Sequence, residues 1–293
     1  MRNFILGTDW WTDCDDAVAL RVLTRYIKRE EANLLGVVIN GCTKYAVASL
    51  MGFLRADGIF GIPVGIDACA TDFGGWARYQ KRLAEDYCPK VTNANGEDGV
   101  RLYRRILAGS AEPVDIIEIG FLQVITALLE SDGDDISEKS GLELVKEKVS
   151  RVWVMGGRWD RAGTKEHNFS RTEKAIVASS KFCELCPVPV TFLGWEVGND
   201  VWSGAALDED DHLHRVLLDH GSKNGRLSWD PMLVLLALIG DAEKAGYETV
   251  TGKASVDKNT GRNYFKKCTE GIHTFVKKKY NSEYYENQID EIL

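Results

Sequence analysis

Residues 7–17 read Gly7-Thr8-Asp9-Trp10-Trp11-Thr12-Asp13-Cys14-Asp15-Asp16-Ala17. This stretch brings four carboxylates, those of Asp9, Asp13, Asp15 and Asp16, into eight consecutive residues. Like charges this close repel one another, so a compact fold keeps them together only where something cationic makes the arrangement favourable. A bound hard cation with oxygen ligands is the simplest such partner.

The flanking residues place the acidic stretch between a strand and a helix. Residues 3–6 are an apolar run typical of a short buried strand, and apolar side chains recur at helical spacing from Ala19 to Ile27. Asp15 and Asp16 therefore open a helix, where carboxylates suit the positive end of the helix dipole. Asp9 lies at the carboxyl end of the strand, which is where open α/β sheets bind ligands.

Three interpretations of the acidic stretch compete. It holds two helix-capping aspartates with accidental neighbours, a structural calcium loop, or a catalytic site built on carboxylates or a metal. A helix–loop–helix calcium loop is disfavoured, because no Gly occupies its turn position and no Glu closes it at the expected distance. We favour the catalytic site.

The rest of the chain alternates apolar, strand-like runs with helical periodicity, which predicts an α/β fold. Near-continuous apolar strands indicate a doubly wound, mostly parallel sheet with helices on both faces. The length suits a single domain over residues 1–293. The predicted strands are residues 34–39, 63–66, 114–119, 149–155 and 188–193, and a helix runs through Leu50 and Phe53.

Two segments break this rhythm. Residues 67–98 form either a lid insertion over the strand ends or an ordinary connecting helix with a loop. Residues 253–293 are polar and rich in Lys and Tyr, and we interpret the Lys277-Lys278-Lys279 run as a solvated face.

Composition excludes several classes of protein. The net charge of −8 argues against a nucleic-acid-binding surface, and no apolar stretch is long enough to cross a membrane. No signal-like pattern precedes the first strand, so a cytoplasmic protein is expected. The cysteines number seven and are scattered, which does not suit a disulfide framework. The lone Cys183-x-x-Cys186 pair is interpreted as two packed thiols.

Two further segments carry candidate site residues. Met155-Gly156-Gly157 follows a predicted strand, and paired glycines there allow close approach of the backbone to a ligand. Glu166 and Asn168 follow in a loop, where both can face a polyhydroxyl group such as a sugar. Asp230 opens the apolar helix of residues 232–239, where it is either a site residue or a simple N-cap.

Taken together, these segments resemble the inosine–uridine nucleoside hydrolase family over most of the chain. The resemblance lies in an ordered set of motifs: Thr8-Asp9, Asp15-Asp16-Ala17, Gly120-Phe121-Leu122, Met155-Gly156-Gly157, Glu166-His167-Asn168-Phe169, Gly194-Trp195-Glu196-Val197-Gly198 and Trp229-Asp230-Pro231. It implies a doubly wound α/β domain with one Ca²⁺ at the bottom of a ribose pocket. It also implies hydrolysis of the N-glycosidic bond of ribonucleosides and a homo-oligomer.

The resemblance also implies roles for individual residues. Asp9, Asp16 and Asp230 would be carboxylate ligands of the metal, and the backbone carbonyl of Gln123 would add a main-chain oxygen. Asp9 would also take the proton from the attacking water.

On the substrate side, Asp15 would hold ribose hydroxyls with the help of Asn40. Glu166 and Asn168 would grip the sugar from the other side, next to Met155. These roles suit an oxocarbenium-like transition state, which nearby carboxylates stabilise while one of them activates water.

This chain also departs from the family pattern. Gly7 stands where the family has its first Asp, and Trp10-Trp11 with a longer loop replaces a small Pro-Gly pair, which leaves Asp13 and Asp15 as rivals for the ribose. Many members carry a His before the last aspartate, where this chain has Trp229. An indole cannot protonate the leaving base, and purine-preferring members stack the base between aromatic rings instead.

The departures shape the expected function. Trp229 with Trp10, Trp11 or Trp76 is a candidate base sandwich, and His167 is interpreted as a wall residue. We expect a Ca²⁺-dependent, purine-leaning ribonucleoside hydrolase. The alternatives are the same fold and metal acting on a modified or atypical N-riboside, and a family member that binds a nucleoside without cleaving it.

Overall fold

The structure is a computed structural model that describes residues 1–11, 13–70 and 75–293. Its central strand is β1 (Arg2–Thr8), which pairs in parallel with β2 (Ala32–Ile39) on one side and β5 (Val114–Glu118) on the other. Successive side chains of a strand point to opposite faces, so Phe4 and Leu6 pack into one hydrophobic core while Ile5 packs into another. Both faces of β1 are therefore buried, which explains its uninterrupted apolar sequence.

Within the described part of the chain, eleven strands form one sheet in the order β4-β3-β2-β1-β5-β6-β8-β13-β11-β12-β7. From β4 to β13 the neighbouring strands are parallel, and from β13 to β7 they are antiparallel. The prediction of an α/β fold with a mostly parallel sheet is confirmed. The remaining strands of this sheet are β3 (Val64–Ile66), β4 (Glu97–Asp98), β6 (Val149–Met155), β7 (Thr164–Lys165), β8 (Val190–Leu193), β11 (Tyr247–Val256), β12 (Arg262–Lys267) and β13 (His273–Lys278), and a separate pair joins β9 (Trp202–Ser203) to β10 (Arg226–Leu227).

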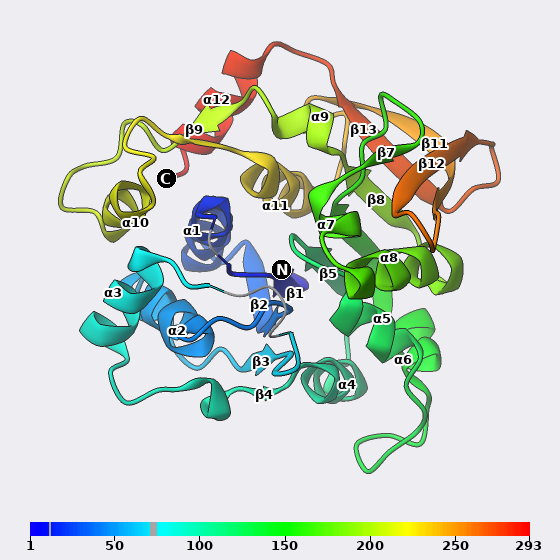
Figure 1. Cartoon of the computed structure of the whole chain (residues 1–293), viewed down its shortest axis with the longest axis horizontal. Coiled ribbons are helices and arrows are strands. Elements are labelled where there is room, and N and C mark those ends of the chain that lie inside the picture. Colours follow the sequence, from blue (N-terminus) through cyan, green and yellow to red (C-terminus); the bar gives the residue numbers. More distant parts are fainter. Residues whose placement is uncertain (12, 71–74) are drawn as a thin grey trace.

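Helices cover both faces of the sheet, as Figure 1 shows with α1 and α11 on one side and α4, α5 and α8 on the other. The first core contains residues of α1 (Asp15–Lys28), α2 (Ala46–Ala56), α3 (Arg78–Tyr87), α10 (His212–His220), α11 (Trp229–Ile239) and α12 (Ser282–Asp290). The second core contains residues of α4 (Gly99–Gly109), α5 (Gln123–Leu129), α6 (Gly141–Lys148) and α8 (Glu173–Leu185). Two short helices, α7 (His167–Ser170) and α9 (Trp195–Gly198), follow strand ends near the pocket described below.

The polar C-terminal segment contributes more to the fold than its composition indicates. We interpreted the run at Lys277 as a solvated face, but β13 lies inside the sheet, parallel to β8, and its Phe275 and Val276 are buried. Lys277 points outward, whereas Lys278 pairs with Asp200. Phe275 and Val276 pack into the two different hydrophobic cores, so both faces of β13 are buried, and the polar and charged residues around this short apolar pair hid the strand.

The segment 67–98 contains α3 and the edge strand β4, while its residues 71–74 lie outside the described part of the chain. Tyr79 and Gln80 are both fully buried, and the Tyr79 hydroxyl and Gln80 Nε2 both donate to the backbone carbonyl of Trp11. Among the described residues of this segment, none lines the pocket described below. Helix α3 thus holds the acidic loop in place, and the possible lid insertion over residues 67–98 stays a prediction.

The Cys183-x-x-Cys186 pair is buried at the end of α8, and both thiols are free. Burial raises the pKa of Cys183 to about 12 and that of Cys186 to about 11, so both thiols stay protonated and pack as small apolar groups. No helix of the described residues combines the length and the apolar character needed to span a bilayer.

Candidate active site

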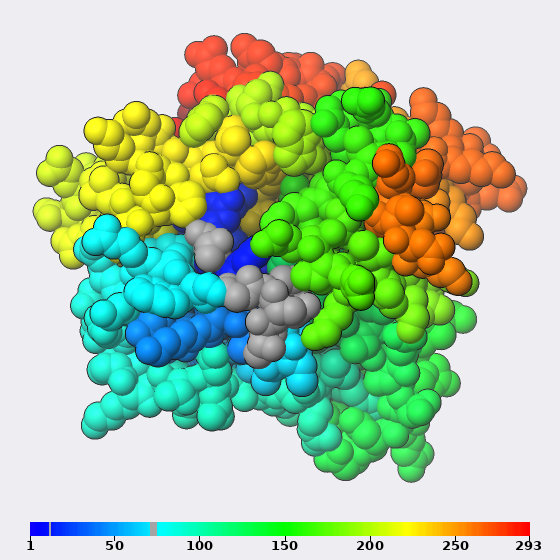
Figure 2. Space-filling view, viewed as in Figure 1, coloured from blue at the N-terminus to red at the C-terminus, as the bar shows by residue number. Residues whose placement is uncertain are grey.

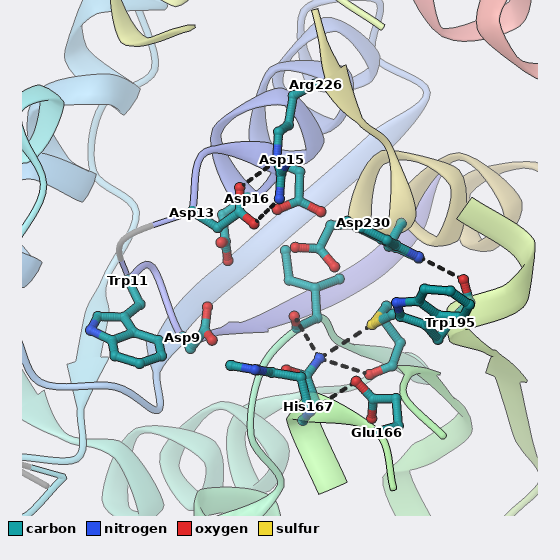
Figure 3. Close-up of a pocket in the computed structure, with 14 residues that line it drawn as sticks. Asp9, Trp11, Asp13, Asp15, Asp16, Glu166, His167, Trp195, Arg226 and Asp230 are labelled. Carbon is teal, nitrogen blue, oxygen red and sulfur yellow. Dashed lines mark hydrogen bonds and ion pairs between the residues drawn. The ribbon is translucent and has the colours of Figure 1, made fainter. Parts of the chain in front are cut away.

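A pocket opens at the carboxyl ends of the central strands. Its cavity has a volume of about 260 Å³. Figure 2 shows the hollow, with atoms of the N-terminal segment at its base, and Figure 3 shows the side chains around it. The lining residues are Asp9, Trp11, Asp13, Asp15, Asp16, Ile119, Met155, Glu166, His167, Asn168, Trp195, Arg226, Trp229 and Asp230.

Two helix starts form the acidic floor of the pocket. Asp15 and Asp16 begin α1, and Asp230 is the second residue of α11, which packs against α1. Carboxylate oxygens of these three residues lie within 4.8 Å of one another, and all three side chains are buried. Ser228 occupies the N-cap of α11, so the simple N-cap interpretation of Asp230 is wrong.

The backbone at Trp10 delivers Asp9 to this floor. Trp10 adopts a positive φ of 41°, which is rare for a bulky residue and is kept only where the surroundings fix it. Its indole N–H donates to Ser49 Oγ at 2.8 Å, and its ring packs edge-on against Phe53 and Tyr79 in the core. Because Trp10 turns inward, Asp9 and Trp11 on either side of it line the pocket.

A close approach between two loops fixes the backbone of Asp9. A Cβ on Gly120 would lie 2.3 Å from the amide nitrogen of Asp9, so only glycine allows the two loops to meet. Asn40 supports the same corner, since its Oδ1 accepts from the Phe121 N–H at 2.9 Å and its backbone carbonyl accepts from Gln123 Nε2 at 2.7 Å. We predicted that Asn40 binds ribose and that Gln123 supplies a metal ligand, but neither lines the pocket. The contacts described here position the loops, and the predicted roles of both residues stay predictions.

The buried carboxylates of the floor repel one another, which raises the free energy of their charged forms. Burial, followed by the charges of Asp15 and Asp13, raises the pKa of Asp9 to about 8. Burial and neighbouring aspartates also raise the pKa values of Asp15, Asp16 and Asp230 well above the usual range. A divalent cation among these oxygens would relieve the repulsion, and an oxygen-only donor set fits a hard cation. Asp16 and Asp230 would hold it, with Asp9 and Asp15 beside them.

The structure separates the two rivals for the ribose, Asp13 and Asp15. Asp13 accepts from Arg226 Nε at 2.8 Å and from Arg226 Nη2 at 2.5 Å, and this arginine holds its pKa below the usual range. Asp13, Cys14 and His220 also form a cluster of possible metal ligands, but Arg226 already neutralises its carboxylate. Asp15, by contrast, lies in the floor with Asp16 and Asp230.

Glu166 and Asn168 face the floor from α7. Glu166 caps this helix: its carboxylate accepts from the Asn168 and Phe169 amides and also from the Gly157 amide at 2.9 Å. Burial raises its pKa to about 7. Asn168 Nδ2 donates to the Met155 carbonyl at 3.1 Å, and Asn168 lines the pocket. Both residues are thus held rigidly by backbone groups.

The glycine pair after β6 serves packing. A Cβ on Gly156 would lie 2.3 Å from the Phe169 ring, and one on Gly157 would lie 2.4 Å from the Trp159 ring. Neither glycine lines the pocket. We expected the pair to admit a ligand, but it admits aromatic side chains of the second core.

Two aromatic walls stand above the floor. Trp11 and His167 lie on one side with ring centroids 6.0 Å apart, and Trp195 and Trp229 lie on the other, joined by a hydrogen bond from Trp229 Nε1 to the Trp195 carbonyl at 2.7 Å. Trp10 is buried in the core and Trp76 does not line the pocket, so the candidate sandwiches with these two residues are wrong.

Sequence reasoning missed Arg226 and gave no role to Trp195 or Glu118. Trp195 stands inside a quoted motif, so its position was a usable signal. Arg226 lies on β10, and nothing in its local sequence connects it with Asp13, which is more than two hundred residues earlier. Glu118 is hidden in an apolar strand.

Glu118 occupies the space that a side chain at Gly7 would need. The two residues are paired across β1 and β5, and a Cβ on Gly7 would lie 1.9 Å from Glu118 Oε2. The Glu118 carboxylate accepts from Tyr103 Oη at 2.5 Å and from Asn40 Nδ2 at 3.3 Å. The buried carboxylate at this end of the sheet therefore comes from Glu118 on β5. In the nucleoside hydrolase family that the sequence resembles, the position of Gly7 carries an Asp.

No protein-family model matches the sequence, and no curated protein is significantly similar to it. Solved structures do match. An inosine-uridine preferring nucleoside hydrolase from Bacillus anthracis is 15% identical, with a TM-score of 0.69 over 100% of this chain and 99% of that one.

Two other solved structures share the fold. A purine-preferring ribonucleoside hydrolase from Gardnerella vaginalis is 14% identical, with a TM-score of 0.70 over 98% of this chain and 96% of that one. The type III effector protein XopQ, complexed with adenosine diphosphate ribose, is 16% identical, with a TM-score of 0.67 over 98% and 91%. The chain therefore has the fold of nucleoside hydrolases, a fold that also serves an effector protein.

Replacing Gly7 by Ala tests the packing against Glu118. The added methyl group collides with a buried carboxylate, so we expect the free energy of unfolding to fall by about 1–3 kcal/mol. In a Glu118→Ala background the same replacement should be nearly neutral. Urea unfolding of the two single variants and the double variant measures this coupling, and strictly additive effects would show that the two residues do not compete for space.

Glu118→Gln tests the buried charge. Burial raises the pKa of Glu118 from its ordinary value of 4.5 to about 8, so the contribution of this carboxyl to the free energy of unfolding falls as the pH rises from about 4.5 to about 8. The glutamine variant lacks this loss and should gain stability relative to the parent by on the order of 1–3 kcal/mol between pH 5 and pH 8. Parallel stability curves for the two proteins against pH would contradict the assignment.

Proposed function

We propose that the protein hydrolyses the N-glycosidic bond of ribonucleosides, with a preference for purines, and that it uses Ca²⁺. The observation that carries the proposal is the floor of the pocket, where buried carboxylates of Asp15, Asp16 and Asp230 converge within 4.8 Å beside Asp9. The fold shared with nucleoside hydrolases supports it.

The donor set of the floor suits calcium. Its side-chain oxygens come from carboxylates alone, and calcium prefers several oxygen ligands in a flexible arrangement. When bound, the ion would lower the pKa of a water molecule and orient it. The proposal of calcium over another hard cation rests on the resemblance of the motifs.

The chain's own residues then divide the chemistry. Asp9 lies at the floor without belonging to the tight trio, and we assign it to accept the proton of the attacking water. Asp15, from below, and Glu166 with Asn168, from α7, hold the ribose hydroxyls. Their negative charge and oxygen atoms stabilise the positive charge that develops on the sugar as the bond to the base breaks.

The walls of the pocket suit a purine. Trp11 with His167 and Trp195 with Trp229 offer flat apolar surfaces on two sides of the cavity. Burial and the nearby Arg171 lower the pKa of His167, so this ring is neutral near pH 7 and is a poor acid. The departing base would therefore take its proton from solvent.

Two alternatives have support of their own. The same site would accept an atypical N-riboside if Trp11 and Arg226 exclude ordinary nucleosides. The second alternative is a protein that binds a nucleoside without cleaving it. It is supported by the effector protein XopQ, which shares this fold. A cytoplasmic homo-oligomer remains our prediction for the assembled protein.

A substrate panel tests the proposal. Free ribose would be measured after incubation with inosine, adenosine, guanosine, uridine and cytidine, with calcium and with a chelator. We expect calcium-dependent release that is fastest from the purines. Equal release of ribose from all five nucleosides would contradict the proposed stacking of a purine between the aromatic walls. No release at any calcium concentration would contradict the proposed hydrolysis.

Asp9→Asn isolates the proposed base. The amide keeps the size of the side chain but cannot accept a proton, so kcat should fall by roughly 10²–10⁴-fold. Thermal unfolding should show an intact fold, since the change removes a charge from a crowded buried cluster. Asp257→Asn, at an exposed turn far from the pocket residues in sequence, is the control. Full activity of the Asp9 variant would contradict the assignment.

A further inference from the structure

Three arginines, called here the arginine rim, stack on tryptophans of the pocket: Arg158, Arg171 and Arg226. Arg226 itself lines the pocket, whereas Arg158 and Arg171 reach it only through the tryptophans they cover. The three tryptophans that line the pocket each have a guanidinium group over the indole. The distances from the guanidinium carbon to the ring centroid are 5.4 Å for Arg171 and Trp11, 4.5 Å for Arg158 and Trp195, and 5.7 Å for Arg226 and Trp229. Trp11 and Trp195 lie on opposite sides of the cavity in Figure 3, and Arg226 lies beside the acidic floor.

Stacked arginines are well suited to bind an anion. The indole face holds the planar guanidinium by a cation–π contact and leaves the N–H donors along its edge available. Such an edge matches the oxygens of a carboxylate or a phosphate and binds them in pairs. A site for an uncharged nucleoside has no need of these donors.

Only part of this capacity is used within the protein. Arg226 directs Nε and Nη2 to Asp13, and Arg158 directs the same two atoms to Asp160. Arg171 is exposed, and among residues 1–11, 13–70 and 75–293 no carboxylate forms an ion pair with it. Arg171 therefore keeps donors available next to a tryptophan that lines the pocket, and Arg226 adds positive charge beside the carboxylates of the floor.

We propose that the preferred substrate is a ribonucleoside 5′-phosphate, with its phosphate held at the arginine rim by Arg171 and Arg226. This inference deepens the proposed function and rests on it for the orientation of the sugar. With the 2′- and 3′-hydroxyls against the carboxylates, a phosphate at either position would be repelled. The base lies between aromatic walls, so the 5′-oxygen is the one position from which an anion reaches the rim.

The reaction keeps the phosphate ester intact. The oxygen of water forms the bond to C1′, the bond from C1′ to the base nitrogen breaks, and the base leaves with a proton from solvent. The products are ribose 5-phosphate and the free base. Arg171 and Arg226 bind the anion and take no part in the proton transfers.

The experiment compares inosine with inosine 5′-monophosphate, and adenosine with adenosine 5′-monophosphate, on the calcium-loaded protein. The measured quantity is the ratio of kcat/KM for each nucleotide to that for its nucleoside. We expect a ratio above ten that declines as salt is added, because the rim contact is partly exposed to solvent.

Arg171→Gln and Arg226→Gln identify the residues responsible. Each should lower the ratio by about tenfold or more, the effect of losing a charge-assisted contact. Arg226→Gln also leaves Asp13 unpaired and threatens the fold, whereas Arg171 is exposed and its replacement is structurally mild. The matched control is Arg29→Gln, because Arg29 is likewise exposed and stacked on an aromatic ring, that of Tyr26, outside the pocket lining. It should leave the ratio unchanged.

The outcomes separate this inference from the proposed function. Cleavage of nucleosides with a ratio at or below one overturns the phosphate preference and leaves the hydrolase intact. If inorganic phosphate accelerates the cleavage of nucleosides, the arginines bind a free anion, and the preference for a nucleotide is overturned as well. If neither class is cleaved, the hydrolase fails, and calorimetry decides the inference. Tighter binding of inosine 5′-monophosphate than of inosine, lost in Arg171→Gln, supports the rim site, and equal binding overturns it.

Discussion

Repulsion between buried carboxylates is the constraint on which the rest of this structure depends. Asp9, Asp15, Asp16 and Asp230 meet where β1 ends and where α1 and α11 begin, and burial raises the pKa of each carboxyl. Isolated buried charges are costly, so a chain that gathers several of them must either protonate them or bind a cation. The oxygen-only donor set of these carboxylates fits the second of these solutions.

The surrounding fold holds these carboxylates in place through a strained backbone at Trp10 and a close backbone approach at Gly120. Trp10 keeps a positive φ because Ser49, Phe53 and Tyr79 fix its side chain in the core. Gly120 exists as glycine because the backbone of Asp9 leaves no room for a Cβ. A strained residue and a forced close approach next to a pocket are the usual marks of a functional site. Here both act on the same short loop.

The sequence predicted the parts of the structure that local patterns encode. Apolar runs gave the parallel strands, and the acidic run before a helical pattern gave the floor of the pocket. Prediction from the sequence failed where a residue contacts another residue that is distant in the chain. Arg226 on β10 pairs with Asp13, Glu118 on β5 fills the space beside Gly7, and β13 enters the sheet from a polar tail. The assignment of the ribose to Asp15 stays a prediction. Asn40 and Gln123, assigned by resemblance to the site itself, have hydrogen bonds that position its loops.

Calcium-dependent thermal unfolding tests the central claim most directly. The account predicts that the protein stripped of divalent ions melts at a lower temperature and that calcium, at one ion per chain, restores it. It also predicts that Asp16→Asn weakens this response and makes the stripped protein more stable than the stripped parent, because one repelling charge is gone. A stripped parent that binds no calcium and melts at the same temperature with or without it would contradict the account.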